Sequence, residues 1–223
     1  MQTGTDKDAP ASAEAPDEAP DRAGGWRGSR EGWLDAARAA LVDSGVEAVK
    51  IAPLSAALGL SRTSFYWFFK DRAALLAALL DDWDAANTGA IRDACAAYAE
   101  TAPEAVLNVI GAFLPGGAFE SRLDFAIRGW AHRDAAVAAR IEAADAARLS
   151  AIRAMFEARG FAPGEADVRA RTMYLTQIGY ISMQAAEDLP TRLARIPAYV
   201  KTFSGAAPTA SELARFEARL QGR

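Results

Sequence analysis

The sequence lacks the features of membrane-spanning and secreted chains. No stretch approaches the roughly 18 to 20 uninterrupted apolar residues that a membrane helix needs. The N-terminus is acidic and rich in proline, so it does not look like a signal peptide. There is a single cysteine, Cys95, and no disulfide can therefore form within the chain. We expect a soluble, cytoplasmic protein.

Residues that commonly carry catalysis or bind metals are also scarce. The only histidine, His132, lies on a different predicted helix from Cys95. We find no glycine-rich phosphate loop, no nucleophile elbow and no His-x-x-x-His or Cys-x-x-Cys metal spacing. Adjacent acids such as Asp81 and Asp82 point in different directions on a helix. The sequence therefore predicts a protein that is not an enzyme and that binds no metal and no cofactor.

A basic excess, which many DNA-binding proteins carry, is missing as well. The net charge is −4, and residues 1–25 account for all of it, since their acids outnumber their bases by four. This Ala- and Pro-rich segment has no hydrophobic periodicity and is predicted to be a disordered acidic tail. The remaining residues balance to zero, so DNA binding must be argued from a motif and not from bulk charge.

What the chain has in abundance is alanine and leucine, with few β-branched residues. Because Ala and Leu lose little side-chain freedom in a helix, this composition predicts an all-α fold, with about ten helices and no strand. Capping residues mark the expected helix starts: Ser29, Ser61, Asp71, Thr101 with Glu104, and Thr209 with Glu212. Expected breaks lie at Gly45, 115–117, 160–164 and Pro190.

Residues 51–69 contain the most informative pattern. A short helix is expected from Ile51 to Leu58, Gly59 permits a tight turn, and a further helix capped by Ser61 should reach about Phe68. Two short helices joined in this way form a helix-turn-helix motif. Apolar side chains should fill its small core: Leu54, Leu58, Leu60, Phe65 and Phe69. A long helix should follow, from the Asp71 cap to about Glu100.

Residues 29–76 resemble the DNA-binding domain of the TetR (tetracycline-repressor) family of transcriptional regulators. The matching positions are Leu34–Arg38, Gly45, Leu54–Arg62, Phe65–Trp67, Phe69, Arg72 and Leu75, without gaps. Three positions depart from the family pattern. Lys50 replaces the usual Thr, Thr63 the usual Gly and Phe68 the usual His, which together suggest an altered operator sequence. Farther along, 124–130 and 177–180 look like segments of some members.

The resemblance implies a helix-turn-helix domain over 26–76 whose third helix enters the major groove. The predicted DNA-binding residues are Lys50, Ser61, Arg62, Thr63, Ser64, Tyr66, Trp67 and Lys70. Arg62 can bind a phosphate or guanine, Thr63 and Ser64 can contact base edges, and the lysines and Tyr66 suit phosphate oxygens. The alternative for Tyr66 and Trp67 is that they belong to the core, as aromatic clusters usually do.

The resemblance further implies that 77–223 form a larger helical domain for effector binding and dimerisation. The predicted effector pocket contains Tyr98, Phe113, Phe125, Trp130, Tyr174 and Gln177, and its aromatic lining suggests an apolar or aromatic effector. The predicted dimer interface, on the helices expected over 168–184 and 193–203, contains Met173, Ile178, Ile181, Leu193, Ile196 and Val200. Alternatively, the aromatic residues are core, and the two helices pack internally.

The hypothesis from sequence is thus a TetR-like regulator and repressor. By this hypothesis it binds a palindromic DNA operator as a homodimer and is released by a small-molecule effector. The alternative is a helical small-molecule-binding protein that has lost DNA binding.

Overall fold

The fold is all-helical. The computed structural model describes residues 28–222, and within that range it contains ten α-helices, one short 3₁₀ helix and no strand. The predicted acidic tail, 1–25, lies outside the described residues. None of the described helices is long and apolar enough to cross a membrane. The prediction of an all-α fold is therefore confirmed.

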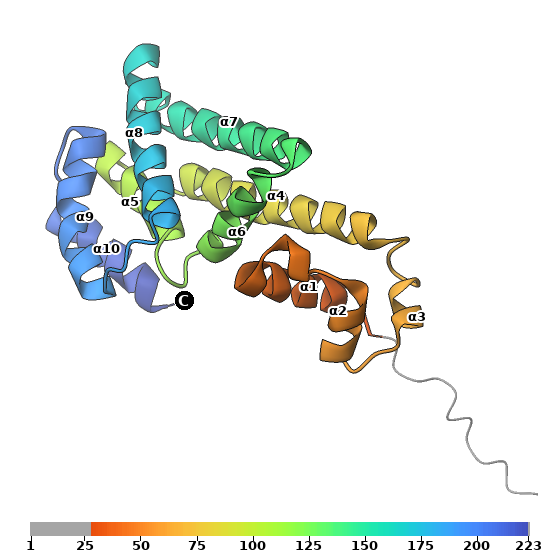
Figure 1. The fold of residues 1–223 in the computed structure, drawn as a ribbon. Coiled ribbons are helices and arrows are strands. Elements are labelled where there is room, and N and C mark those ends of the chain that lie inside the picture. The colour runs from red at the N-terminus through yellow and green to blue at the C-terminus, as the bar shows by residue number, and fades with distance from the viewer. Residues whose placement is uncertain (1–27, 223) are drawn as a thin grey trace, which may run out of the picture.

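The N-terminal lobe consists of three α-helices and a 3₁₀ turn. The elements are α1 (Arg30–Ser44), η1 (Val46–Ala48), α2 (Ile51–Ala57) and α3 (Arg62–Phe65). A long helix, α4 (Arg72–Ala96), then runs from this lobe into the larger one. Figure 1 shows α3 at the end of the molecule remote from α8, α9 and α10.

The larger lobe contains six helices. They are α5 (Ala102–Ala112), α6 (Ser121–Ala131), α7 (Ala135–Glu157), α8 (Pro163–Ser182), α9 (Leu189–Ser204) and α10 (Ala210–Gln221). Of these, α6 and the first half of α7 share the apolar core of the N-terminal lobe. α7 packs on both α4 and α8, and α5 packs between α4, α9 and α10. α6 lies between α1 of the small lobe and α7 of the large one, so it joins the two lobes a second time (Figure 1).

Local capping chemistry starts the helices where the sequence indicates. The Ser29 hydroxyl accepts a hydrogen bond from the Gly32 amide at 3.0 Å, and the Asp71 carboxylate accepts one from Ala74 at 2.8 Å. The box at Thr209 is complete. At Thr101 only half of the predicted box forms, because the Glu104 carboxylate turns away to other partners, the Glu100 amide and the Arg215 guanidinium.

Helix ends differ more from the prediction than helix starts. α3 stops at Phe65 instead of about Phe68, because the amides of residues 66–68 each bond to the carbonyl three residues earlier and the chain continues as turns. α4 stops at Ala96, four residues early. α8 and α9 begin earlier than expected, at Pro163 and Leu189, since a proline in the first helical turn loses no internal hydrogen bond.

A buried polar network ties α4, α6, α7 and α8 together. Asp124 on α6 is fully buried, and its carboxylate accepts hydrogen bonds from Trp83 Nε1 at 3.0 Å and Arg148 Nη1 at 3.1 Å. Its second oxygen accepts from Arg128 Nε at 2.7 Å. The Arg148 guanidinium lies 4.9 Å from the Trp83 ring centroid and also bonds to the Tyr174 hydroxyl at 3.2 Å. Four helices thus share one fully buried ion pair.

We predict that Arg148→Ala lowers the free energy of unfolding by about 3 kcal/mol, because removing one partner of a buried pair leaves the other charge without full compensation. Urea denaturation followed by circular dichroism measures this. The control is Arg153→Ala on the same helix, whose side chain is 47% exposed and should cost less than about 0.5 kcal/mol. Equal effects of the two substitutions would contradict the structural role of the network.

Candidate nucleic-acid interface

The turn between α2 and α3 positions α3. Gly59 has φ +65°, a left-handed conformation that glycine adopts without strain, and the Leu60 amide then bonds back to the Ser55 carbonyl at 2.9 Å. Ser61 caps the new helix by accepting from the Ser64 amide at 3.3 Å. The turn therefore ends at Ser61 and α3 begins at Arg62, as Gly59 and Ser61 predict.

A single aromatic anchor holds the inner face of α3. Phe65 is fully buried, its ring meets Trp33 of α1 edge-on at 5.3 Å, and it stacks on Phe69 at 5.6 Å. Leu54 of α2 completes this core. Because such a short helix cannot be stable by itself, its position depends on this packing.

The opposite face of α3 and its following turn is exposed. Tyr66 is 60% and Trp67 64% exposed, and Arg62 and Thr63 are exposed beside them. The alternative in which Tyr66 and Trp67 are core residues therefore does not hold in this structure. Large aromatic rings kept at the surface beside an arginine are suited to contacts with a nucleic-acid backbone and base edges.

Ser64 requires a correction. It was predicted to contact base edges with Thr63, but it is 5% exposed, and its hydroxyl donates to the Ser61 carbonyl at 2.7 Å. It lies next to Phe65 on the inner side of the short helix. The exposed set from the prediction is therefore Lys50, Ser61, Arg62, Thr63, Tyr66, Trp67 and Lys70.

The two lysines flank α3 in the chain. Lys50 occupies the cap position of α2 without making a side-chain cap hydrogen bond, and Lys70 precedes the Asp71 cap of α4; both are exposed. A lysine in either place presents a point charge that suits a phosphate oxygen.

Arg72 connects this surface to α4. Its guanidinium donates from Nη2 to the Val46 carbonyl at 2.7 Å and from Nε to the Val49 carbonyl. These two carbonyls belong to the segment that leads into α2. A displacement of the start of α4 is therefore passed on to the helix-turn-helix motif through hydrogen bonds as well as through apolar packing.

Comparison with known families agrees with this geometry. Residues 34–79 match the model for bacterial regulatory proteins of the tetR family, a stretch that spans most of α1, all of α2 and α3, and the start of α4. The helix-turn-helix segment of the chain therefore matches the TetR family of regulators. No curated protein matches the sequence.

Solved structures share the fold of this chain. A structure described as a TetR-family transcriptional regulator from Rhodococcus sp. has a TM-score of 0.59 at 18% identity, covering 78% of this chain and 98% of the other. A transcriptional regulator from Rhodococcus sp. Rha1 has a TM-score of 0.58 at 17% identity, covering 87% and 97%. The similarity extends beyond the matched segment, so the large lobe also has the fold found in these regulators.

The predicted effector-pocket residues do not form one group. Phe113 and Phe125 line the same cavity, which has a volume of about 350 Å³. Trp130 lines a different one, of about 640 Å³, between α6 and the end of α1. Tyr98 is 76% exposed in the segment between α4 and α5, where its hydroxyl donates to Glu100, so it lines neither cavity.

Tyr174 and Gln177 are buried, and both form hydrogen bonds with other side chains. The Tyr174 hydroxyl donates to Asp145 at 2.6 Å, and burial, helped by that carboxylate, raises the pKa of the phenol, which stays neutral. Gln177 accepts a hydrogen bond from Arg192 at 3.1 Å. Tyr174 is therefore part of the buried network around Asp124, whereas Gln177 orients an arginine that lines the cavity of Phe113 and Phe125. Arg192 was not singled out in the sequence, where nothing distinguishes it from other helical arginines.

The residues predicted for the dimer interface require a correction as well. Three of them, Met173, Ile196 and Val200, are at most 2% exposed in the single chain and belong to the core of the large lobe. Ile178, Ile181 and Leu193 are half-buried against the same core. The alternative, that these apolar faces pack internally, describes them better. The opposite side of α8 instead exposes large apolar residues: Val168, Leu175 and Met183.

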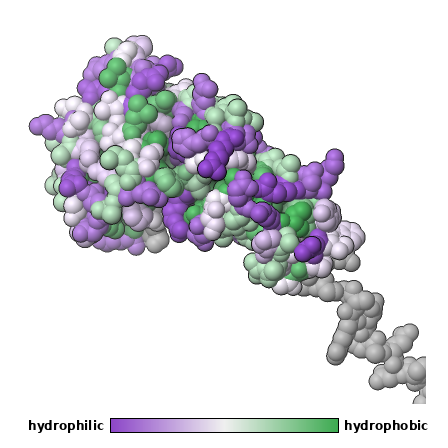
Figure 2. All heavy atoms as spheres, viewed as in Figure 1, coloured by the Kyte–Doolittle hydropathy of each residue, from purple (hydrophilic) through white to green (hydrophobic). Residues whose placement is uncertain are grey.

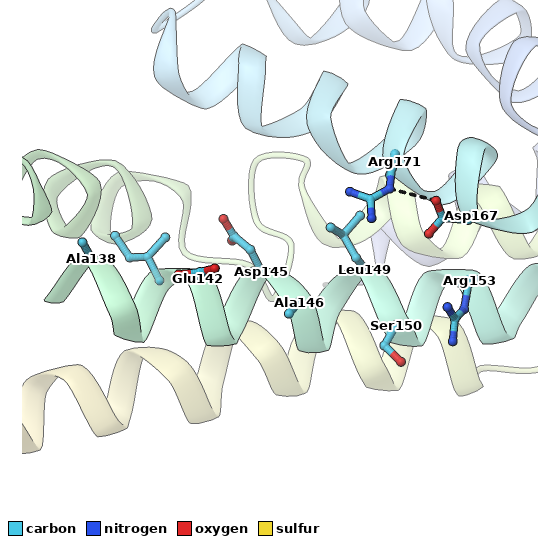
Figure 3. A pocket seen from close by; sticks show the side chains of 10 residues that line it. Ala138, Glu142, Asp145, Ala146, Leu149, Ser150, Arg153, Asp167 and Arg171 are labelled. Carbon is cyan, nitrogen blue, oxygen red and sulfur yellow. Dashed lines mark hydrogen bonds and ion pairs between the residues drawn. The ribbon is translucent and has the colours of Figure 1, made fainter. Parts of the chain in front are cut away.

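A shallow groove between α7 and α8 carries mixed charge. Its lining includes Glu142, Asp145 and Arg153 from α7 and Asp167 and Arg171 from α8, and Figure 3 shows the ion pair of 2.9 Å between the last two. Both carboxylates and guanidinium groups line the groove, so their charges partly neutralise one another. The groove gives no reason to prefer a ligand of either charge.

The histidine, the cysteine and the acidic side chains lie apart in the part of the chain that the structure describes. Within 28–222 no three His, Cys, Asp or Glu side chains lie close enough to hold a metal ion. Burial raises the pKa of the Cys95 thiol to about 12, partly opposed by Arg159, so the thiol stays protonated and unreactive near neutral pH. His132 forms the C-terminal cap of α6 and lines the cavity that contains Trp130.

We predict that Lys70→Ala weakens binding to all DNA sequences alike and lowers the slope of log affinity against log salt by about one, because one phosphate contact is lost. Fluorescence anisotropy with a labelled duplex at several salt concentrations measures the slope. Arg219→Ala on α10, at the far end of the molecule, is the control and should leave it unchanged. An unchanged slope for Lys70→Ala would remove this residue from the interface.

Proposed function

We propose that this TetR-family regulator is a homodimeric repressor that binds a palindromic operator in the cytoplasm and is released by a small molecule. The observation that carries the proposal is the short helix α3, anchored by the buried Phe65 and presenting Arg62, Thr63, Tyr66 and Trp67 outward. Its first residues suit base edges in the major groove, and the flanking lysines suit phosphates.

The proposal requires two copies of the chain. One four-residue helix reads too few base pairs for specificity, whereas two copies separated by roughly 34 to 36 Å read both halves of a palindrome. The exposed face of α8 suits this contact. Val168, Leu175 and Met183 are 62%, 57% and 81% exposed, and their spacing places them along one side of the helix. Figure 2 shows apolar residues gathered over α8 on the visible face.

Gly179 lies between Leu175 and Met183 on the same helix. A Cβ atom at this position would meet nothing within 4 Å, so the surface there is open to a neighbouring helix. Exposed apolar residues of this size next to a small residue are typical of a helix pair that is completed by a second subunit. We therefore assign the dimer contact to this face of α8 and not to the core residues that the sequence indicated.

Release of DNA can follow from the two connections between the lobes. Arg38 of α1 pairs with Asp82 of α4 and, at 3.3 Å, with Glu120 just before α6. Arg72 holds the loop before α2 at the start of α4. A ligand that displaces α6 relative to α1 would therefore change the spacing of the two recognition helices in the dimer. To turn a 99:1 excess of the DNA-binding conformation into a 1:99 minority, the ligand must bind the other conformation about 5.5 kcal/mol more tightly.

The dimer assignment predicts that Leu175→Lys yields a monomer, because a charge replaces an apolar side chain at the centre of the contact. Lysine is a good helix former, so the fold of α8 should persist. Light scattering measures the mass. In a gel shift with genomic fragments at low salt, the wild-type chain should retard specific fragments, and Leu175→Lys should lose this retardation.

Tyr98→Lys is the matched control, since Tyr98 is also a large side chain, is 76% exposed and lies far along the chain from α8. It should remain dimeric and bind DNA. If Leu175→Lys stays a dimer, the assigned face is wrong. If the wild-type chain retards no fragment, the alternative of a helical ligand-binding protein without DNA binding is favoured instead.

A further inference from the structure

The cavity of about 350 Å³ that contains Phe113 and Phe125 lies where both lobes meet. Val42 of α1 contributes to it from the DNA-binding lobe, Phe125 comes from α6, and Ile181 comes from the end of α8. Phe113 forms its inner wall and is 3% exposed. These four side chains provide an apolar surface that an aromatic or aliphatic body can contact.

The polar lining of this cavity is positively charged. Arg122 and Arg192 line it, and no aspartate or glutamate does. Four other hollows in the described part of the chain each include at least one carboxylate, as the groove of Figure 3 illustrates with Glu142, Asp145 and Asp167. A negative charge is therefore favoured here and not in those hollows.

Arg192 lacks the partner that a half-buried arginine normally has. Its guanidinium lies 4.8 Å from the Tyr180 ring centroid and donates to the neutral Gln177 amide at 3.1 Å, and it forms no ion pair with any carboxylate among residues 28–222. Burial lowers the pKa of Arg192, because the charged form loses hydration. An anion bound beside this guanidinium would supply the stabilisation of the positive charge that is lost with its hydration.

Arg122 plays a smaller part. It pairs with Asp43 of α1 at 3.2 Å, and both side chains are more than half exposed, so water screens this pair strongly. It adds positive potential at the mouth of the cavity, whereas Arg192 and its Gln177 support provide the oriented donor within it.

We propose that this cavity binds an amphipathic organic anion, with its carboxylate or sulfonate on the Arg192 guanidinium and its apolar body against Val42, Phe113 and Phe125. This inference rests on the proposed function in one respect: the ligand acts as the effector because it contacts α1 and α6 together. Binding itself needs neither DNA nor a second subunit.

Two fluorescent probes that share an aromatic body but differ in charge test the proposal. The anion is 1-anilinonaphthalene-8-sulfonate, and the neutral analogue is N-phenyl-1-naphthylamine. With the full chain, the anion should bind saturably. Arg192→Gln should lower the affinity for the anion about tenfold, the loss expected for one charge-assisted hydrogen bond. The affinity for the neutral probe should change less than about twofold, since its apolar contacts remain.

Arg195→Gln is the matched control. Arg195 lies on the same helix, is exposed, pairs with Glu187 and lies outside this cavity, so neither probe should be affected. Ser121→Asp is the second variant. It places a carboxylate in the cavity wall at the first residue of α6, where a negative charge stabilises the helix, so folding should be preserved. This substitution should also lower the affinity for the anion and leave the affinity for the neutral probe unchanged.

Unchanged affinity of the anion in Arg192→Gln and Ser121→Asp, or equal loss of both probes, would overturn the proposal. The outcome is independent of DNA binding. A chain that binds the anion through Arg192 but retards no DNA fragment would retain this site and contradict the repressor. A chain that retards DNA but binds the anion equally well without Arg192 would support the DNA-binding function and contradict this site.

Discussion

The structure depends on the fully buried ion pair between Asp124 and Arg148. It joins α6 to α7 directly and reaches α4 through Trp83 and α8 through Tyr174. Buried charges stabilise one another only while every hydrogen-bond partner is in place. Moving one of these four helices relative to the others would therefore leave a buried charge uncompensated. Because α4 extends from this network to the helix-turn-helix lobe, the network also fixes the direction from which α3 is presented.

The joint between α1 and α6 is held more weakly. Its ion pairs, Arg38 with Glu120 and Arg122 with Asp43, are partly or largely exposed, and cavities lie on either side of Phe125. In the function that we propose, the small lobe tilts at this looser joint while α4 remains firmly held. A ligand bound at the joint would then change the angle of α3 without disrupting the buried core.

Local chemistry explains what the sequence could predict. Caps at Ser29 and Asp71 and the turn at Gly59 depend on neighbours within a few residues, and all appear in the structure. The predicted burial of Phe65 is also found, although Phe65 packs on Trp33 of α1. The inward side of Ser64 and the early end of α3 depend on hydrogen bonds within the turns, which periodicity does not reveal. The side of α8 that faces the core, and the burial of Arg148, depend on partners from helices distant in the sequence. An apolar stripe alone does not show whether its partner belongs to the same chain.

Selection from a random duplex library with the full chain would show whether α3 of two subunits reads DNA. We expect enrichment of an inverted repeat whose half-sites lie one helical turn, or a multiple of it, apart. Substituting Thr63, at the exposed start of α3, should change the preferred bases within each half-site and not their spacing. Absence of any enriched sequence, or an enriched single site without symmetry, would contradict the account.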